Sequence, residues 1–263
     1  MSELSYKDEA ASAYDRAFAH VSTHFLPFLL RAARLEPGQL ALDAATGTGI
    51  AAEAALAVVG PGGHVTAADV SQAMVDRARE RLAGSRNASV LVEDCQALSF
   101  DDGSFDAVLC SLGLMFFPDP ARGLAEFHRV LRPGGRAAVS VSTTPERSYN
   151  GRINAIIARR VPSLADATAR TFSLGDEARL RYLFEEAGFR DVETAAQTHR
   201  FVLPSFEAYF GPFEQGGGSS GQAYVVLPEA ERRAVRDEVR RNVGDTGGPI
   251  AIEVEERLAS GRR

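Results

Sequence analysis

The amino-acid sequence predicts an α/β fold, in which a mostly parallel sheet lies between layers of helices. Short apolar segments alternate with segments of helical periodicity between residues 38 and 142. Alternation on this scale is typical of parallel strands joined by helical crossovers. Glycine and proline interrupt it at Gly60–Gly63 and Arg132–Gly135, where one element must end before the next strand.

Individual elements follow from the same patterns. Residues 11–34 carry apolar positions at helical spacing and indicate one or two amphipathic helices. The strands expected between residues 38 and 142 are 40–44, 64–68, 89–92, 105–112 and 136–141. The helices expected between them are 50–59, 72–82 (with Ser71 as its N-cap) and 120–131.

Beyond residue 143 the alternation loosens. The elements expected there are helical segments at 145–170, 180–187 and 228–241 and strands within 189–202 and 250–258. A glycine/serine run at 216–221 is interpreted as a mobile loop. Four nearby aromatic residues either wall an apolar substrate pocket or anchor this segment to the sheet: Phe206, Tyr209, Phe210 and Phe213.

The bulk composition excludes several classes of protein. Hydrophobic residues make up 45% and charged residues 24%, a balance typical of globular rather than disordered chains. The net charge of −6 provides no global basic field, so we expect no nucleic-acid partner. The two cysteines, Cys95 and Cys110, form no CxxC metal motif. The N-terminal residues are charged and no apolar stretch approaches the roughly 18–20 residues that span a bilayer, so we expect a cytoplasmic protein with no membrane partner.

Acidic residues and a glycine-rich turn follow three successive predicted strands. The first strand leads into Asp43-Ala44-Ala45-Thr46-Gly47-Thr48-Gly49, where a ligand can approach the backbone because glycine lacks a Cβ. Asp69 follows the second strand and suits the hydroxyls of an adenosine ribose. Asp94 follows the third strand, where a carboxylate suits an adenine amino group. Open α/β sheets bind ligands at this edge, so the sequence predicts a ligand that contains adenosine.

Two kinds of nucleotide ligand are compatible with this pattern of residues. Gly47-x-Gly49-x-x-Ala52 satisfies a dinucleotide fingerprint, so an NAD-dependent oxidoreductase is one alternative. Asp43 counts against it, because a carboxylate inside the turn repels a pyrophosphate and attracts a methionine ammonium group. The dehydrogenase pattern also usually stands at the very N-terminus, whereas this turn lies well inside the chain. A second alternative is a non-catalytic nucleotide-binding protein.

Four segments resemble the class I S-adenosylmethionine methyltransferases, in particular the small-molecule branch that includes ubiquinone and menaquinone biosynthesis enzymes: LALDAATGTG, TAADVSQAMVDRARER, VEDCQALSFDDGSFDAVLC and FHRVLRPGGRAAVS. The resemblance implies a Rossmann-like three-layer sandwich whose sheet has seven strands, the last antiparallel. It implies S-adenosyl-L-methionine as cofactor and S-adenosyl-L-homocysteine as product. In a single domain over 1–263, residues 1–36 would form a helical cover, 38–142 the cofactor-binding core, and 145–180 and 203–248 substrate-lid insertions.

The resemblance also implies roles for single residues around the methionine part of the cofactor. The residues that would border this part are Asp43, Ala45, Gly47 and Gly49, with Ser111 and Leu112 beside the sulfonium. Ala45 stands where the family most often has glycine. Tyr14, on the N-terminal helix, either closes over the cofactor or packs in the core.

Around the adenosine part, Asp69 would hold the ribose and Val70 or Met74 would flank the adenine. Asp94 would meet the adenine amino group, with the Cys95 backbone N–H near the ring.

The catalytic group is not defined by the sequence, because methyl transfer needs a base only when the acceptor must lose a proton. The candidates are His20, His24 and Tyr209. His20 and His24 lie one helical turn apart but have no apparent third ligand, so we expect no metal site. The sequence thus predicts methyl transfer to an O, C or N atom of a small aromatic or apolar metabolite, by a monomer or homodimer.

Overall fold

The computed structural model describes residues 8–161 and 169–263, with side chains from residue 14 onward. Its strands are β1 (Leu40–Ala44), β2 (His64–Asp69), β3 (Ala88–Val92), β4 (Phe105–Ser111), β5 (Leu131–Ser142), β6 (Arg190–Leu203) and β7 (Ile250–Arg262). Its helices are α1 (Asp8–Ala32), α2 (Ile50–Val59), α3 (Gln72–Leu82), α4 (Pro120–Val130), α5 (Gly151–Arg160), α7 (Glu177–Glu186), α8 (Phe206–Glu214), α9 (Gly218–Val225) and α10 (Glu229–Asn242). Short 3-10 turns η1 (Leu114–Phe116) and η2 (Pro145–Arg147) follow β4 and β5.

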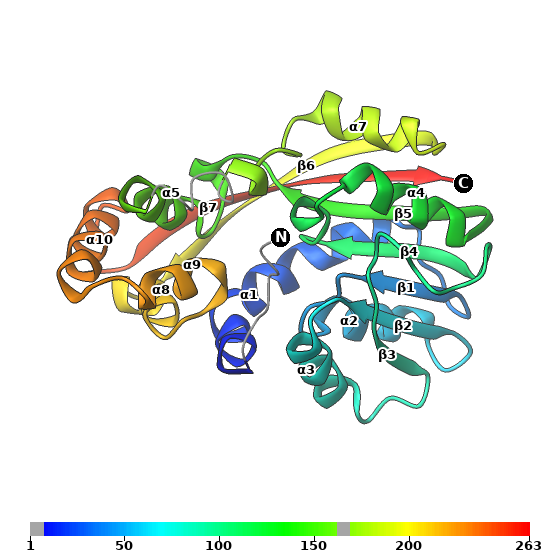
Figure 1. Cartoon of the computed structure of the whole chain (residues 1–263), viewed down its shortest axis with the longest axis horizontal. Helices are drawn as coiled ribbons and strands as arrows, with labels where there is room; N and C mark the ends of the chain where they lie inside the picture. Colours follow the sequence, from blue (N-terminus) through cyan, green and yellow to red (C-terminus); the bar gives the residue numbers. More distant parts are fainter. Residues whose placement is uncertain (1–7, 162–168) are drawn as a thin grey trace.

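The strands form one sheet in the order β3-β2-β1-β4-β5-β7-β6 (Figure 1). Strands β1 to β5 pair in parallel, and β7 is antiparallel to both of its neighbours, β5 and β6. The predicted seven-stranded sheet with an antiparallel last strand is therefore confirmed. The strand order reverses beside β1, and open α/β sheets bind ligands at such a point, outside the carboxyl ends of the strands.

Helices cover both faces of the sheet, which gives the predicted three layers (Figure 1). On one face Leu42 and Phe127 pack with Phe184, beneath α4 and α7. On the other face Leu109 packs with Leu29 of α1 and with the alanines of α2. In the part of the chain that the structure describes, no helix is both long and apolar enough to cross a membrane.

Strands β6 and β7 extend beyond the end of β5. β7 pairs with β5 only from Glu256 to Arg262, but with β6 from Ile250 onward. The overhanging half of this pair lies beside α5, α8, α9 and α10 (Figure 1). A separate apolar core fills this region, in which Val21 of α1 packs with Ile153 of α5 and Phe206 of α8. We call this part the arm: α5, α8, α9, α10 and the overhanging strands.

The prediction of a mobile loop at 216–221 is wrong. Helix α9 begins at Gly218, and Gly216 to Gly218 are buried. A Cβ on Gly218 would lie 2.5 Å from the ring of Phe18, and a Cβ on Gly221 would lie 2.5 Å from the backbone of Gly216. Glycine is present here because α9 packs closely on α1 and on the end of α8, not because the chain needs a hinge.

The predicted insertion at 145–180 divides between two parts of the molecule. Ile153 and Ile157 of α5 belong to the core of the arm. Leu174 and Leu180 instead pack in the core of the main sheet with Phe184. Of the described residues of the expected insertion, α5 therefore lies in the arm, while Leu174 and Leu180 belong to the main sheet, which α7 covers; residues 162–168 lie outside the described residues.

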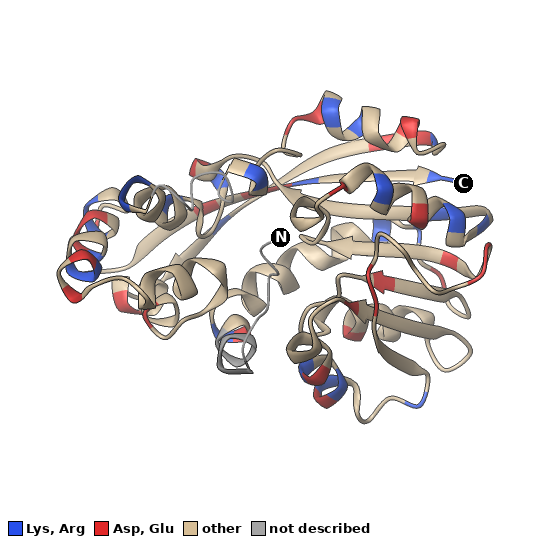
Figure 2. Ribbon diagram, in the orientation of Figure 1, with Lys and Arg blue, Asp and Glu red and all other residues tan. Residues whose placement is uncertain are grey.

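Charged residues of both signs are frequent on the outer helices, for example on α3 and α10 (Figure 2). Helix α10 is joined to α5 by an Arg160–Glu238 ion pair of 2.6 Å and to α8 by an Arg240–Glu207 pair of 2.7 Å. Exposed ion pairs contribute roughly 0–1 kcal/mol each, so the buried apolar core of the arm supplies most of its stability.

Candidate functional site

The loop between β1 and α2 contains three residues in the left-handed region. Ala45, Gly47 and Gly49 have φ angles of 55°, 56° and 85°. The Thr46 N–H donates to the carbonyl of Ala68 at 2.9 Å and so ties the loop to β2. A Cβ on Gly47 would meet no heavy atom within 4 Å, so the backbone there borders open space. Left-handed backbone at a residue other than glycine is strained, and such strain is concentrated in ligand-binding loops.

Asp43, at the end of β1, is completely buried. Its Oδ2 accepts a 2.5 Å hydrogen bond from the Thr46 hydroxyl, and its Oδ1 has no hydrogen-bond partner. Burial raises the pKa of Asp43 to about 7, against the lowering effect of the Thr46 bond. A buried carboxylate with an unpaired oxygen is costly by itself and is stabilised by a cation.

Asp69, at the end of β2, faces the same loop. Its two carboxylate oxygens accept hydrogen bonds of 2.9 Å from the backbone N–H groups of Gly47 and Ser71. Burial raises the pKa of Asp69, and these backbone bonds oppose the rise. A carboxylate has about four acceptor positions, so Asp69 can hold the loop and still accept from two ligand hydroxyls.

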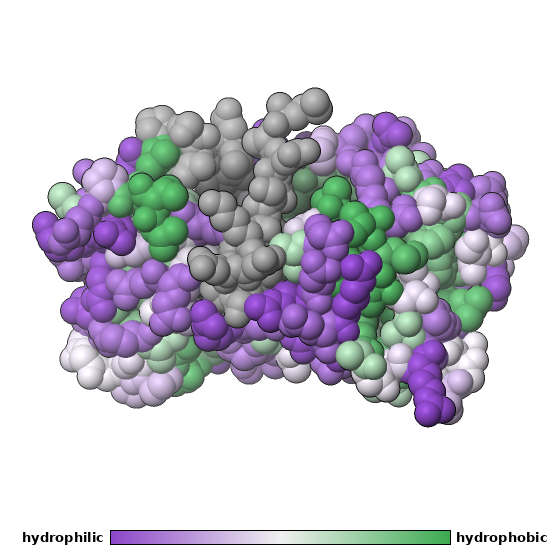
Figure 3. All heavy atoms as spheres, turned by 60° about the horizontal axis from the view of Figure 1, so that its bottom comes forward, coloured by the Kyte–Doolittle hydropathy of each residue, from purple (hydrophilic) through white to green (hydrophobic). Residues whose placement is uncertain are grey.

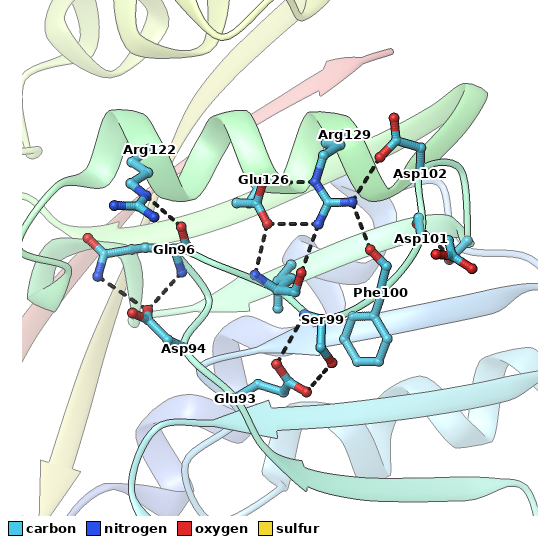
Figure 4. Close-up of polar contacts among 12 residues, drawn as sticks. Glu93, Asp94, Gln96, Ser99, Phe100, Asp101, Asp102, Arg122, Glu126 and Arg129 are labelled. Carbon is cyan, nitrogen blue, oxygen red and sulfur yellow. Dashed lines mark hydrogen bonds and ion pairs between the residues drawn. The ribbon is translucent and has the colours of Figure 1, made fainter.

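Asp94 follows β3 in an exposed turn (Figure 4). Its Oδ1 accepts from the backbone N–H of Gln96 at 2.9 Å, and the Gln96 carbonyl accepts from Arg122 of α4 at 2.8 Å. Further along the segment, Arg129 donates to the carbonyl of Phe100 at 2.7 Å. The turn after β3 is therefore held against α4 with the Asp94 carboxylate at the surface.

The other predicted adenine neighbours differ in exposure. Val70 is 67% exposed, whereas Met74 is buried in α3. Cys95 is also buried, and burial raises the pKa of its thiol to about 12. Of the two side chains expected to flank the adenine, only Val70 is open to a ligand.

Exposed apolar side chains surround this edge of the sheet. Val92, at the end of β3, is 45% exposed and Phe116, in η1 after β4, is 39% exposed. Figure 3 shows apolar side chains gathered in patches between hydrophilic ones on the face that it presents. Exposed apolar surface of this kind is typical of a site that binds a ligand or a partner.

The loop after β4 lies against the loop after β1. Leu112 is left-handed, with φ of 51°, and its N–H donates to the carbonyl of Ser140 at 3.0 Å. A Cβ on Gly113 would lie only 2.6 Å from the Cβ of Ala45. The predicted pairs Ala45/Gly47 and Ser111/Leu112 are thus brought together at the reversal of strand order.

Helix α1 is joined to the glycine-rich loop by Asp15, which the sequence patterns did not identify. The Asp15 carboxylate accepts from the Thr48 hydroxyl and from Arg81 of α3, both at 2.6 Å. Arg81 also donates to the carbonyl of Thr48 at 2.8 Å. The contact joins residues 33 and 66 positions apart, and no local motif indicates it. Tyr14, the neighbour of Asp15, packs on Phe18 with ring centroids 4.9 Å apart.

The three catalytic candidates, on α1 and α8, pack beside the aromatic rings of Tyr149 and Phe201. The ring of His24 lies 3.7 Å from that of His199 on β6, and His20 packs against Tyr149. Burial lowers the pKa of both His20 and His24. Tyr209 is buried in the arm, where its hydroxyl donates to the carbonyl of Tyr149 at 2.7 Å. Within the described residues, no group of three or more His, Cys, Asp or Glu side chains is arranged to hold a metal ion.

Sequence comparison places this site in a known family. Residues 42–139 match the family model described as a methyltransferase domain. A protein named demethylmenaquinone methyltransferase from Clavibacter sepedonicus is 35% identical over 221 residues, which cover 75% of this chain and 89% of that protein. A protein of the same name from Staphylococcus aureus is 32% identical over 61% of this chain and 72% of its own length.

Solved structures show the same fold. A SAM dependent methyltransferase from Aquifex aeolicus has a TM-score of 0.56 at 22% identity, covering 72% of this chain and 90% of its own. Phosphoethanolamine N-methyltransferase 2 from Haemonchus contortus, in complex with S-adenosyl-L-methionine, has a TM-score of 0.63 at 16% identity, covering 98% of this chain and 58% of its own.

The two alternatives, an NAD-dependent oxidoreductase and a non-catalytic nucleotide-binding protein, find no support in these likenesses. The chain belongs to the class I S-adenosylmethionine-dependent methyltransferases that act on small molecules, in the branch of the quinone-biosynthesis enzymes.

Proposed function

We propose that the methyl acceptor is a small aromatic ring that carries a hydroxyl group, of the phenol or quinol class. The observation that carries this proposal is a row of aromatic rings that begins beside the glycine-rich loop. Tyr14 packs on Phe18, Phe18 lies 6.1 Å from Tyr149, and Tyr149 lies 6.1 Å from Phe201 of β6. Aromatic rings favour offset or edge-on contact with one another, so this row suits a flat aromatic acceptor. The names of the two bacterial relatives support the same class.

The cofactor would lie along the carboxyl ends of β1, β2 and β3. The unpaired Oδ1 of Asp43 fits the ammonium group of the methionine part, directly or through water. Asp69 would accept from the ribose hydroxyls, and Asp94, at the surface, from the adenine amino group. Val70 would cover one face of the adenine, and the open backbone at Gly47 leaves space for the methionine part.

At the neighbouring loops, the left-handed Leu112 and the adjacent Ser111 would border the sulfonium. When bound, the cofactor supplies an electrophilic methyl group, and the protein supplies orientation and water exclusion. In this proposal the arm and α1 form the cover of the acceptor site.

Two measurements test the proposal. Isothermal titration is expected to detect S-adenosylhomocysteine binding, with NAD at least tenfold weaker. A radiolabelled methyl-transfer screen over phenols, quinols, amines and carboxylic acids is expected to show turnover with hydroxylated aromatic rings. Equal binding of NAD would refute the residue roles, and transfer only to amines or carboxylates would refute the acceptor class.

A further inference from the structure

Glu256 lies on β7 at the same edge of the sheet as the candidate site. It stands opposite Ser142 of β5 and Gln197 of β6. Side chains at directly opposed positions of antiparallel strands share one face of the sheet. The two residues that alternate with Glu256, Val254 and Leu258, are buried against α1. Glu256 therefore faces the layer between the sheet and α1, at the junction of the arm with the main sheet.

The carboxyl group of Glu256 is buried without a counter-charge. The residue is 2% exposed, and its Oε1 has no hydrogen-bond partner. The only bond to its side chain in the described structure comes from the Ser140 hydroxyl. Burial raises the pKa of Glu256 to about 8. The preceding residue shows the contrast, because Glu255 is ion-paired with Arg147 at 2.6 Å. A buried carboxyl group without a counter-charge is disfavoured when it is ionised, and groups of this kind are concentrated at functional sites.

A short hydrogen-bond chain joins Glu256 to the loop after β4. The N–H of Leu112, whose shorter bond is to the Ser140 carbonyl at 3.0 Å, also lies 3.3 Å from the Ser140 hydroxyl oxygen, and that hydroxyl bonds to Glu256. Leu112 is the strained residue assigned above to the sulfonium end of the cofactor site. The carboxyl group of Glu256 is thus two hydrogen bonds from the backbone of Leu112, which is proposed to border the sulfonium.

Other titratable groups share this face but do not neutralise Glu256. They are Asp43 on β1, Glu193 and His199 on β6, and His20 and His24 on α1. In the part of the chain that the structure describes, no ion pair joins any of them to Glu256. Within the described residues, the Oε1 atom of Glu256 therefore has neither a counter-charge nor a hydrogen-bond partner.

We propose that Glu256 is the general base of the methyl transfer and that its Oε1 receives the proton of a hydroxylated aromatic acceptor. This inference rests on the acceptor class proposed above. For a hydroxyl acceptor, a bond forms between its oxygen and the methyl carbon, and the carbon–sulfur bond breaks with its electron pair remaining on sulfur. The hydroxyl proton passes to the carboxylate. The sulfonium cation and the carboxylate anion become a neutral thioether and a neutral carboxylic acid, so charge balances within a buried site.

The experiment compares Glu256→Gln with the wild-type chain and with a matched control, Glu253→Gln. Glu253 lies on the same strand but is half exposed. The acceptor is 1-naphthol, and S-adenosylhomocysteine affinity is measured alongside turnover. Positioned general bases contribute roughly 10²–10⁴-fold, so kcat is expected to fall at least 100-fold in Glu256→Gln and less than twofold in Glu253→Gln. The dissociation constant of S-adenosylhomocysteine is expected to stay within about threefold in both variants.

A readout without turnover uses infrared spectroscopy of the complex with S-adenosylhomocysteine. Wild type is expected to show a protonated-carboxyl band that titrates near pH 8, shifts when 1-naphthol is added, and is absent from Glu256→Gln. Normal turnover in Glu256→Gln, or a loss of S-adenosylhomocysteine affinity that matches the loss of turnover, would overturn the role of Glu256. Failure of the wild-type chain to methylate 1-naphthol and every other hydroxylated aromatic ring of the screen would instead overturn the proposed acceptor class.

Discussion

Replacing Asp43 with asparagine is expected to stabilise the ligand-free protein at high pH while weakening cofactor binding. The carboxyl is completely buried, and its pKa rises from 3.8 to about 7 on folding. A raised acid pKa means that folding favours the protonated form. The loss of folding stability caused by ionising Asp43 is absent below pH 3.8, grows as the pH rises, and reaches its full value above about pH 7.

The size of the effect follows from the shift in pKa. One pKa unit corresponds to about 1.4 kcal/mol, so the shift of Asp43 amounts to about 4 kcal/mol at pH 8. Asparagine avoids this penalty and keeps an acceptor for the Thr46 hydroxyl. It places an unpaired N–H where Oδ1 now lies, at a cost of about 1–3 kcal/mol. The variant should therefore be more stable than the wild type by about 1–3 kcal/mol at pH 8, and less stable at pH 4.

The assay is urea denaturation of both proteins without cofactor at several pH values from 4 to 8. The difference in unfolding free energy should change by about 1.4 kcal/mol per pH unit up to about pH 7 and then level off. Other groups with a raised pKa, such as Glu256, affect both proteins alike, so their contribution cancels in the difference in unfolding free energy. The exposed Asp76→Asn variant, as control, should stay within about 0.5 kcal/mol of wild type. At pH 8 the Asp43 variant should also bind S-adenosylhomocysteine at least tenfold more weakly. A pH-independent stability difference would refute the reasoning.

Four further changes test other parts of the site. Asp69→Ala removes the acceptor of the Gly47 N–H and of the proposed ribose contacts, so titration should show at least tenfold weaker S-adenosylhomocysteine binding; an unchanged dissociation constant would remove Asp69 from the site. Ala45→Gly relieves left-handed strain of about 1–2 kcal/mol, offset in part by unfolded-state entropy, so urea denaturation should show a gain of about 0.5–1 kcal/mol rather than a loss. Phe213→Ala empties a fully buried position and should destabilise the protein by about 3–5 kcal/mol, and wild-type stability would contradict its placement in the core of the arm. Asp15→Ala removes the contact that joins α1 to the glycine-rich loop, so stopped-flow displacement should show S-adenosylhomocysteine dissociating up to about fivefold faster. An unchanged dissociation rate would mean that the Asp15 contact does not control release of the ligand.

Local signals in the sequence were sufficient for the elements of the main sheet. Ser71 was predicted as an N-cap, and its side chain accepts from the N–H of Met74 in the structure. The strands from β1 to β5 were found because each is a short apolar run followed by a turn or an acidic residue. Strand β7 was underestimated, since it runs to Arg262 and alternates buried with exposed residues only in its first part. The glycine run at 216–221 was misjudged because glycine serves close packing as well as flexibility, and only the neighbouring helix shows which one applies.

The residues that sequence patterns missed share one property: their partners lie far away in the chain. Asp15 meets Thr48 and Arg81, and Glu256 meets Ser140. Each stands in a segment whose spacing indicates only a helix or a strand, because a charged residue on such an element is usually solvated. Burial alone distinguishes Glu256 from its neighbours, and burial at β7 depends on α1, which is more than 200 residues earlier in the chain. The proposed cofactor loops precede that contact in sequence and can be recognised locally. The proposed acceptor side combines α1 and β7 with β5, which are far apart in the sequence, so its residues can be identified only when the three elements are seen together.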